Sequence, residues 1–405
     1  MLLKGFLMPA TTELPVPMRA LLAGARRKQP TLLDLIQELV RAESPSDDKA
    51  AVNACVALAA AHAKALGGRV KLHRQKSFGD LLEARFGPKS KAGAAGRILL
   101  LGHLDTVWPL GTLKTMPCRV GEGRLWGPGT LDMKTGAAMA FTAIEMLTEA
   151  GLLNGEIVLL LNTDEEVGSP ASRPITERLA AECAAVFVLE PAQGLAYKTA
   201  RKGVGDWRID VTGVAAHAGV DFEKGASALR ELARVVETVS GWTDLKRGVT
   251  VNVGVAGGGS KSNVIPAQAW AEVDVRIASN ADGPRMERKF TALKPTDKRC
   301  TLTVSGGINR PPMMRTRGTV RLYRQARALA AELGFPLEEA RSGGGSDGNF
   351  TSALGIPTLD GMGAVGEGAH ARHESILVEH LAPRTALLAG LLAGCSNATA
   401  PVTLS

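Results

Sequence analysis

The chain has 405 residues, of which 45% are apolar and 22% charged, as in a globular protein large enough to form two domains. It contains no run of about eighteen apolar residues, so we expect no membrane-spanning helix and no membrane partner. The formal charge is +8, but Lys and Arg are spread along the chain and aromatic residues make up only 4%, which argues against nucleic-acid binding. The positive charge suits a small anionic substrate instead.

The cysteines favour a reduced, cytoplasmic setting. They are odd in number, scattered and without a CxxC pair, which argues against a disulfide framework and a thiolate zinc site; they are Cys55, Cys118, Cys183, Cys300 and Cys395. Residues 1–30 carry their basic residues mainly after the apolar patch, the reverse of a secretory signal. We therefore expect residues 1–30 to be a mobile lead-in.

Residues 31–198 alternate between helical and strand patterns. Apolar residues recur at helical spacing in several segments, whereas shorter continuous apolar runs indicate strands that are buried on both faces. The expected helices are 31–42, 47–67, 135–151 and 174–183, and the expected strands are 96–105, 155–162 and 184–190. This alternation predicts an α/β domain with a mostly parallel sheet and helices on both faces.

Residues 199–316 have a different pattern. Strands are expected at 205–219, 249–258, 267–277 and 299–307, and helices at 225–242 and 283–294. The order β-α-β-β-α-β is typical of a ferredoxin-like α+β domain. The α/β pattern returns over 317–395, with helices at 320–334 and 381–394, and 396–405 is a tail. The sequence therefore predicts a small domain inserted into a larger one.

The expected strands of the larger domain end on polar side chains. In a parallel sheet the carboxyl ends of the strands meet at one edge, where ligands bind. So many carboxylates in one place cannot all stay ionised without a cation between them, and the sequence predicts a metal centre. The residues are His103 and Asp105 after the first strand, Glu165 and Glu166 after the second, Glu190 after the third, and Asp132 in the glycine-bordered loop "GPGTLDMKTG".

The spacing of these residues suggests which of them bind metal and which have other roles. His103 and Asp105 point to the same side of a strand, so one can ligate while the other accepts the far ring N–H. The adjacent side chains of Glu165 and Glu166 diverge, so one can ligate while its neighbour remains a base. Asp132 is the candidate bridge between two ions about 3.5–4 Å apart.

A second imidazole is expected from the late loop "GEGAHARHESI", where His370 is the first choice and His373 the rival. Taken singly, these motifs have simpler explanations. Two adjacent glutamates are usually a solvated loop, a His-x-Asp pair is usually structural, and "GGGSDG" is usually a flexible loop. Their joint occurrence at the strand ends favours the metal centre.

Several motifs carry a resemblance over about residues 35–395. They are "GHLDTVWP", "GPGTLDMKTG", "NTDEEVGS", "VLEP", "GVAAHAG", "GGGSKSNVIPAQAWAEVDVR", "GGGSDG" and "GAHARHES". In this order they resemble the di-zinc aminoacylase/carboxypeptidase (peptidase family M20) superfamily, most closely its glutamate carboxypeptidases of the carboxypeptidase G type. The resemblance implies a catalytic domain with two Zn²⁺ ions per chain, for which Co²⁺ or Mn²⁺ substitutes, and an inserted domain that forms a homodimer.

The resemblance also implies roles for the metal-centre residues. His103 and Glu190 would bind separate zinc ions, and Asp132 would bridge them. Glu166 would complete the first site and His370 the second.

Three further residues gain roles by the same resemblance. Glu165 would be the general base and Asp105 would orient His103. His217, in "AAHAG", would reach the active site of the partner subunit and stabilise the oxyanion. Without the resemblance, His217 is simply a histidine in a turn.

The resemblance places Asn263 and Arg276 around a substrate carboxylate, and a guanidinium suits that role because it binds a carboxylate through two hydrogen bonds. An arginine at a strand end is otherwise usually a surface charge. The expected function is zinc-dependent hydrolysis of the amide bond of N-acyl or short peptidyl amino acids with a free carboxylate. The alternatives are an N-acetyl or N-succinyl amino acid deacylase, a dipeptidase, and a non-catalytic metal-stabilised binding protein.

Overall fold

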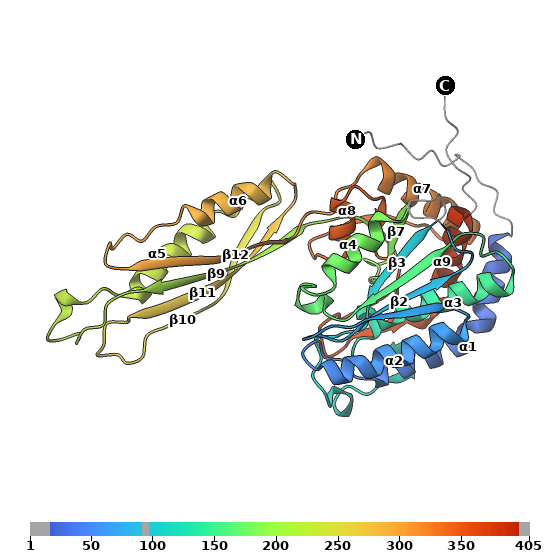
Figure 1. Cartoon of the computed structure of the whole chain (residues 1–405), viewed down its shortest axis with the longest axis horizontal. Coiled ribbons are helices and arrows are strands. Elements are labelled where there is room, and N and C mark those ends of the chain that lie inside the picture. The colour runs from blue at the N-terminus through green and yellow to red at the C-terminus, as the bar shows by residue number, and fades with distance from the viewer. Residues whose placement is uncertain (1–16, 91–96, 397–405) are drawn as a thin grey trace, which may run out of the picture. The chain divides into compact units, whose positions relative to one another are not determined.

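The computed structural model describes residues 17–90 and 97–396 and divides the chain into two compact units (Figure 1). Unit 2 comprises residues 201–314 and 342–345, and unit 1 comprises the rest. The sequence assigned residues 342–345 to the larger domain. The structure places them in unit 2, where the Lys202 N–H donates to the carbonyl of Ser342 and the Arg201 guanidinium donates to two further carbonyls, those of Gly344 and Gly345.

Unit 1 is built around a six-stranded sheet with the order β1-β2-β6-β3-β7-β14. Neighbours among β6, β3, β7 and β14 are parallel, whereas β2 runs antiparallel to both β1 and β6. The strands are β1 (Arg69–His73), β2 (Leu81–Phe86), β3 (Ile98–His103), β6 (Ile157–Asn162), β7 (Ala185–Val188) and β14 (Thr358–Leu359). The mostly parallel sheet is confirmed, although the sequence analysis did not anticipate β1 and β2.

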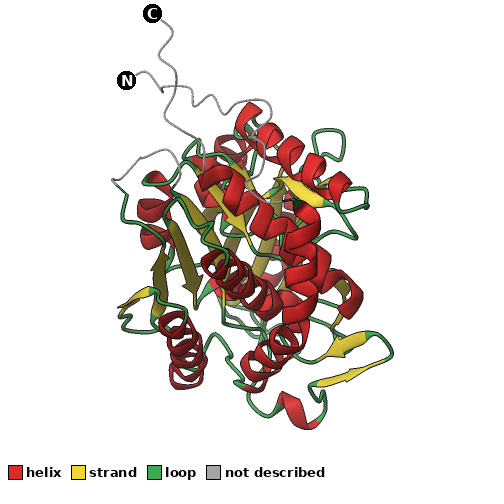
Figure 2. Cartoon of the chain, turned by 90° about the vertical axis from the view of Figure 1, so that its right-hand side faces the viewer, coloured by secondary structure: helices red, strands yellow, loops and turns green. Residues whose placement is uncertain are grey.

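Successive residues of β3 enter different hydrophobic cores. Leu100 joins one core with residues of several helices, while Leu99 and Leu101 join a second core with Leu179. The helices of unit 1 are α1 (Met18–Arg41), α2 (Lys49–Ala65), α3 (Thr135–Glu149), α4 (Arg173–Ala181), α7 (Arg317–Glu332), α8 (Gly348–Ala353) and α9 (Leu381–Ser396). They cover both faces of the sheet, which explains why β3 is apolar throughout (Figure 2).

Residues 18–30 are helical, so the prediction of a mobile lead-in over residues 1–30 is wrong for this part. These residues form the first half of α1, which packs against α9 and α3. Met18, Leu21 and Ala25 recur at helical spacing and are buried, so this segment belongs to the core. The preceding residues 1–16 lie outside the described part of the chain.

Two small sheets were not predicted. The first has the order β15-β16-β5-β4 and brings the late loop beside residues 119–126. Its strands are β4 (Arg119–Gly121), β5 (Arg124–Trp126), β15 (Gly366–Glu367) and β16 (Ser375–Leu377). The second pairs β8 (Tyr197–Arg201) with β13 (Glu339–Ser342). Such short strands leave too few residues for an alternating pattern to be recognised.

Unit 2 has a four-stranded antiparallel sheet with the order β10-β11-β9-β12, as expected for a ferredoxin-like chain. Its elements are β9 (Gly203–Thr212), α5 (Ala228–Ser240), β10 (Thr250–Gly258), β11 (Gln268–Ile277), α6 (Asp282–Thr291) and β12 (Thr301–Arg310). In its core the ring of Trp207 stacks on Phe290 with centroids 4.3 Å apart. In the described parts of both units, no helix is long and apolar enough to cross a membrane.

Candidate metal centre

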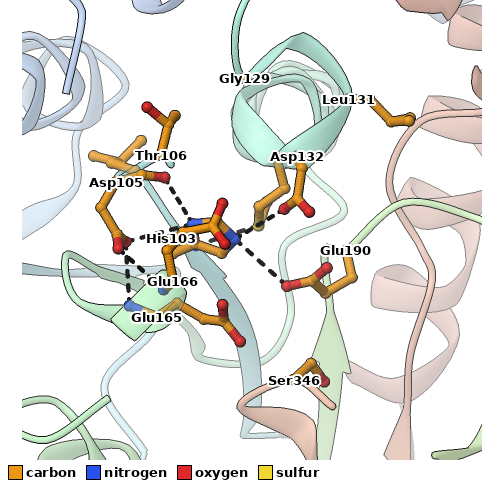
Figure 3. A network of polar contacts seen from close by, with 12 residues as sticks. His103, Asp105, Thr106, Gly129, Leu131, Asp132, Glu165, Glu166, Glu190 and Ser346 are labelled. Carbon is orange, nitrogen blue, oxygen red and sulfur yellow. Dashed lines mark hydrogen bonds and ion pairs between the residues drawn. The ribbon is translucent and has the colours of Figure 1, made fainter. Parts of the chain in front are cut away.

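The ends of three parallel strands carry polar side chains to one edge of the unit 1 sheet (Figure 3). His103 is the last residue of β3, and Glu190 follows β7. Glu165 and Glu166 lie in the short helical turn η3 (Glu165–Val167) after β6. Asp132 lies in the turn η2 (Thr130–Lys134) directly before α3. The fold therefore brings together residues that are up to 87 positions apart, from His103 to Glu190.

Each oxygen of Asp132 faces a different imidazole. Its Oδ1 lies 3.1 Å from Nε2 of His103, and its Oδ2 lies 3.5 Å from Nε2 of His370. His103 Nε2 is also 3.5 Å from Glu190, and His370 Nε2 is 3.1 Å from Glu166. These contacts join His103 with Glu190 and His370 with Glu166, which differs from the division of ligands that the resemblance implies. Asp132 stands between the two groups, as a bridge requires.

Asp105 is fully buried and contacts two parts of the centre. Nδ1 of His103 donates to the backbone carbonyl of Asp105 at 3.0 Å, while the Asp105 carboxylate is 3.4 Å away. The carboxylate accepts hydrogen bonds from the hydroxyl of Ser46 at 2.8 Å and from the backbone N–H groups of Glu165 and Glu166 at 3.3 and 3.2 Å. Asp105 thus fixes the His103 tautomer mainly through its main chain and holds the glutamate turn through its side chain.

The protonation of the cluster reflects its crowded charges. Hydrogen bonds to Asp132 and Glu166 raise the pKa of His370 to about 10. Burial opposes protonation of His103, but its bonds to neighbouring carboxylates raise its pKa well above the usual value. Burial raises the pKa of Glu166, with the charge of Asp132 adding to the shift. The bare ligands therefore retain protons that a bound cation would displace.

The residues fit a pair of divalent cations. Imidazole nitrogens and carboxylate oxygens are the ligands that zinc takes in hydrolytic sites. Groups of ligand atoms from His103, Asp132 and Glu166, and from His103, Glu165 and Glu190, lie within 4.8 Å of one another. Among the described residues, the buried Oε1 of Glu166 has no hydrogen-bond partner. A buried carboxylate oxygen of this kind is expected where a cation is to bind.

His373, the alternative to His370, is exposed, and within the described ranges no ion pair joins it to the acidic cluster. His370 is half-exposed and has a left-handed backbone, with φ of 60°. A left-handed non-glycine residue is uncommon and often marks a functional site.

The remaining predicted residues lie in unit 2. Nδ1 of His217 accepts hydrogen bonds from the backbone N–H groups of Gly219 and Val220 at 3.1 and 3.2 Å. Asn263 lies beside this turn, since its carbonyl accepts the N–H of the residue after His217. Arg276 lies on β11 and binds the carboxylate of Asp274 through two hydrogen bonds of 2.9 and 2.6 Å. The guanidinium therefore already has an acidic partner.

Sequence reasoning missed three residues that support the centre. Ser46 binds Asp105, and the buried Lys134 donates from Nζ to the carbonyls of Leu39 and Ala42 at the end of α1. The third, Glu374, binds the Asp132 loop. Lys134 lies two residues after Asp132, and Glu374 lies four residues after His370, both inside the quoted motifs. Their presence in these motifs is the sequence feature that could have identified them.

Comparison with known proteins gives consistent matches. The model of peptidase family M20/M25/M40 matches residues 99–394. Carboxypeptidase G2 of Pseudomonas sp. (strain RS-16) is 30% identical over 380 residues, covering 92% of this chain and 91% of the relative. The succinyl-diaminopimelate desuccinylase of Stenotrophomonas maltophilia (strain R551-3) is 28% identical over 370 residues, covering 86% of this chain and 95% of the relative.

Solved structures show the same fold at lower identity. The aminopeptidase PepT of Bacillus cereus ATCC 10987 aligns with a TM-score of 0.76 at 23% identity, covering 91% of this chain and 99% of its own. The YXEP protein of Bacillus subtilis, described as a dinuclear metal binding peptidase, aligns with a TM-score of 0.65 at 15% identity, covering 92% and 100% of the two chains. With a family model that spans most of the chain, the protein is a metallohydrolase that belongs to peptidase family M20/M25/M40.

Proposed function

We propose that the protein is a zinc-dependent hydrolase that cleaves the amide bond of N-acyl or peptidyl amino acids whose terminal carboxylate is free. The observation that supports this best is the position of Asp132, whose oxygens lie 3.1 Å from His103 and 3.5 Å from His370. A carboxylate in that position suits two ions about 3.5–4 Å apart, as in two-metal hydrolases. The 30% identity to carboxypeptidase G2 supports the carboxypeptidase type.

The distances between the side chains support a division of the ligands between two ions. The first ion would be held by His103, Glu190 and Oδ1 of Asp132, and the second by His370, Glu166 and Oδ2 of Asp132. Zinc suits this mixture of imidazole nitrogen and carboxylate oxygen, and Co²⁺ or Mn²⁺ accepts the same ligands.

Glu165 has the general-base role in this proposal. When bound, the cations supply Lewis acidity that acidifies water and polarises the carbonyl of the scissile amide. Glu165 takes the proton from the attacking water and then passes it to the leaving nitrogen. A Glu165 oxygen lies within 4.8 Å of ligand atoms of His103 and Glu190, and Asp105 holds the Glu165 main chain. Its closeness to these two residues supports the role of Glu165 as the base that acts on water at the centre.

Arg276 and Asn263 would bind the carboxylate of the leaving amino acid. To do so, Arg276 must either release Asp274 and bind the substrate carboxylate, or bind that carboxylate while it remains bonded to Asp274. Both side chains of that pair are partly exposed, and exposed ion pairs contribute only about 0–1 kcal/mol, so the exchange costs little.

The active form would be a homodimer formed through unit 2, with His217 serving the site of the partner subunit. Because Nδ1 of His217 accepts two backbone N–H groups, a neutral ring carries its proton on Nε2. The exposed ring can therefore donate a hydrogen bond to an oxyanion. Complementation between His217→Ala and Glu165→Gln chains in mixed dimers would support this arrangement, and verified mixed dimers without recovered activity would contradict it.

A second candidate is deacylation of N-succinyl or other N-acyl amino acids. It is favoured by the 28% identity to a succinyl-diaminopimelate desuccinylase over 95% of that relative. Both candidates use the same centre and differ in the acyl group that they accept.

The test is a hydrolysis panel with zinc-reconstituted protein. The panel holds short peptides and N-acyl amino acids, each with a free or an amidated terminal carboxylate. We expect cleavage of free substrates, loss of activity after chelation, and recovery with added zinc. Equal cleavage of free and amidated substrates would contradict the carboxypeptidase type, and turnover only of N-succinyl substrates would select the second candidate.

A further inference from the structure

Glu374 is a buried carboxylate that contacts the loop bearing the bridging ligand. Only 1% of the surface of Glu374 is exposed. Oε1 accepts the backbone N–H groups of Leu131 and Asp132 at 2.8 and 3.0 Å. Oε2 accepts the backbone N–H of Gly129 at 3.0 Å and the indole N–H of Trp108 at 2.8 Å. Four donors therefore converge on one side chain, two on each oxygen.

The main chain reinforces this contact. The strand β16 begins at Ser375, directly after Glu374, and pairs with β5, where Ser375 lies opposite Trp126. The N–H of Gly127 donates to the carbonyl of Glu374 at 3.3 Å. The segment 124–132 is thus joined to 374–377 by strand pairing and by the Glu374 side chain.

Glu374 also ends the turn that directly follows the turn of His370. In these two turns the N–H of Ala371 donates to Gly368 at 2.8 Å, and the N–H of Glu374 donates to Ala371 at 2.9 Å. His370, with its left-handed backbone, lies inside the turn that the first bond closes, and the second bond joins Glu374 to the end of that turn. One residue therefore links the loop of Asp132 to the turn of His370, although 238 positions separate those two residues.

We propose that Glu374 is a positioning residue that assembles the half of the metal centre formed by His370 and Asp132. The inference rests on the proposed two-metal centre. The Glu374 carboxylate bonds to backbone and indole N–H groups rather than to the side chain of Asp132, and so fixes the backbone that presents the ligands. A carboxylate is required because all four groups around it are donors, and an amide offers only one acceptor oxygen.

The variant Glu374→Gln tests the proposal with little change of volume. Its amide nitrogen would face two N–H donors, so the loop must shift. Metal-free protein is equilibrated at a series of buffered free zinc concentrations, and bound zinc is counted by elemental analysis. We expect the zinc concentration for half-occupancy of one of the two ions to rise about 10- to 100-fold, the usual effect of losing a partner that orients a ligand.

Glu231→Gln is the matched control. Glu231 is 2% exposed and accepts the backbone N–H groups of Thr296 and Asp297 at 2.6 and 3.2 Å, but it lies in unit 2. It reproduces the loss of a buried carboxylate clamp without touching a ligand loop. We expect its zinc binding to match that of the native protein.

Trp108→Phe provides a milder probe that leaves both Glu374 oxygens hydrogen-bonded. We expect it to weaken zinc binding less than Glu374→Gln does. In the double variant the indole N–H no longer faces the new amide. Trp108→Phe should therefore lower zinc affinity less in the Glu374→Gln background than in the native protein, or should even raise it there. Additive losses would contradict a shared role of the two residues.

The outcomes separate this inference from the proposed function. If the native protein binds two zinc ions and Glu374→Gln binds both with unchanged affinity, the positioning role is wrong and the two-metal centre stands. Equal weakening by Glu231→Gln would also overturn the positioning role, because the effect would be general. If the native protein binds fewer than two ions at saturation, both are overturned. Should Glu374→Gln fail to fold, native zinc affinity in Trp108→Phe would overturn the inference, and a moderate loss would support it.

Discussion

Two buried carboxylates of unit 2 and two carboxylates of the metal centre in unit 1 have different partners. In unit 2, Asp282 accepts Ser279 at 2.6 Å and Arg247 at 2.8 Å, and Glu231 accepts two backbone N–H groups. Burial opposes ionisation of both, but these donors lower the pKa of each. In unit 1, the carboxylates of Asp132 and Glu166 share one imidazole, and the pKa of Glu166 is raised.

The difference separates structural from functional acids. The donors of Asp282 and Glu231 favour the charged form of each carboxylate and so stabilise the fold of unit 2. In the metal centre, burial and the charge of Asp132 raise the pKa of Glu166, whereas His103 and His370 lower that of Asp132. The protons held by this cluster must leave when a cation binds. Burial alone does not distinguish the two classes, whereas the identity of the partners does.

The largest expected effect is on turnover. Glu165→Gln should lower kcat by about 10²- to 10⁴-fold, because it removes the proposed base, and should leave zinc content intact. Glu166→Gln should instead lower zinc content, since it removes a proposed ligand. Steady-state kinetics and elemental analysis of both variants check this. The reverse pattern would exchange the two roles.

The next effect is the pH dependence of zinc binding. The pKa of metal-free His370 is raised to about 10 and that of His103 is also raised, so both rings carry protons at neutral pH. Zinc must displace these protons, and its affinity should rise with pH by about tenfold per unit for each proton released. Competition titrations at pH 6, 7 and 8 measure the slope. A flat profile would show that the ligands are already deprotonated.

A smaller effect is expected in unit 2. Glu231→Gln leaves at least one of two partly buried N–H groups without a full acceptor, which should lower the free energy of unfolding by about 1 kcal/mol. Denaturant unfolding followed by tryptophan fluorescence measures the loss. Zinc content should not change; a loss of zinc would mean that the two classes of carboxylate are not independent.

The smallest effect is the response of unit 2 to acid. The folded pKa of Asp282 lies below its usual value, so its stabilising contribution is present above the unfolded pKa near 3.8. The contribution is lost as the pH falls through the lower folded value. In Asp282→Asn, the stability difference from the native protein should therefore shrink at low pH. Unfolding midpoints between pH 2 and 6 test this, and a constant difference would contradict the ionic role.

The sequence determined the elements that carry the centre. Apolar strands that end on His103, Glu165 and Glu190 predict a buried parallel sheet, and such a sheet brings its carboxyl ends together. The β-α-β-β-α-β order of the inserted segment could also be predicted from the sequence. Each of these signals lies within a short window, because strand and helix periodicity are local properties.

Tertiary structure decided which groups face each other. The pairing of His103 with Glu190, the contact of Arg276 with Asp274, and the clamp formed by Glu374 depend on side-chain directions at positions that periodicity does not fix. Likewise, α1 begins at Met18 because that residue finds a core to bury against. Local pattern fixes where a side chain is placed along the chain. Its hydrogen-bond partner is chosen only when distant segments, such as 129–132 and 368–374, pack together.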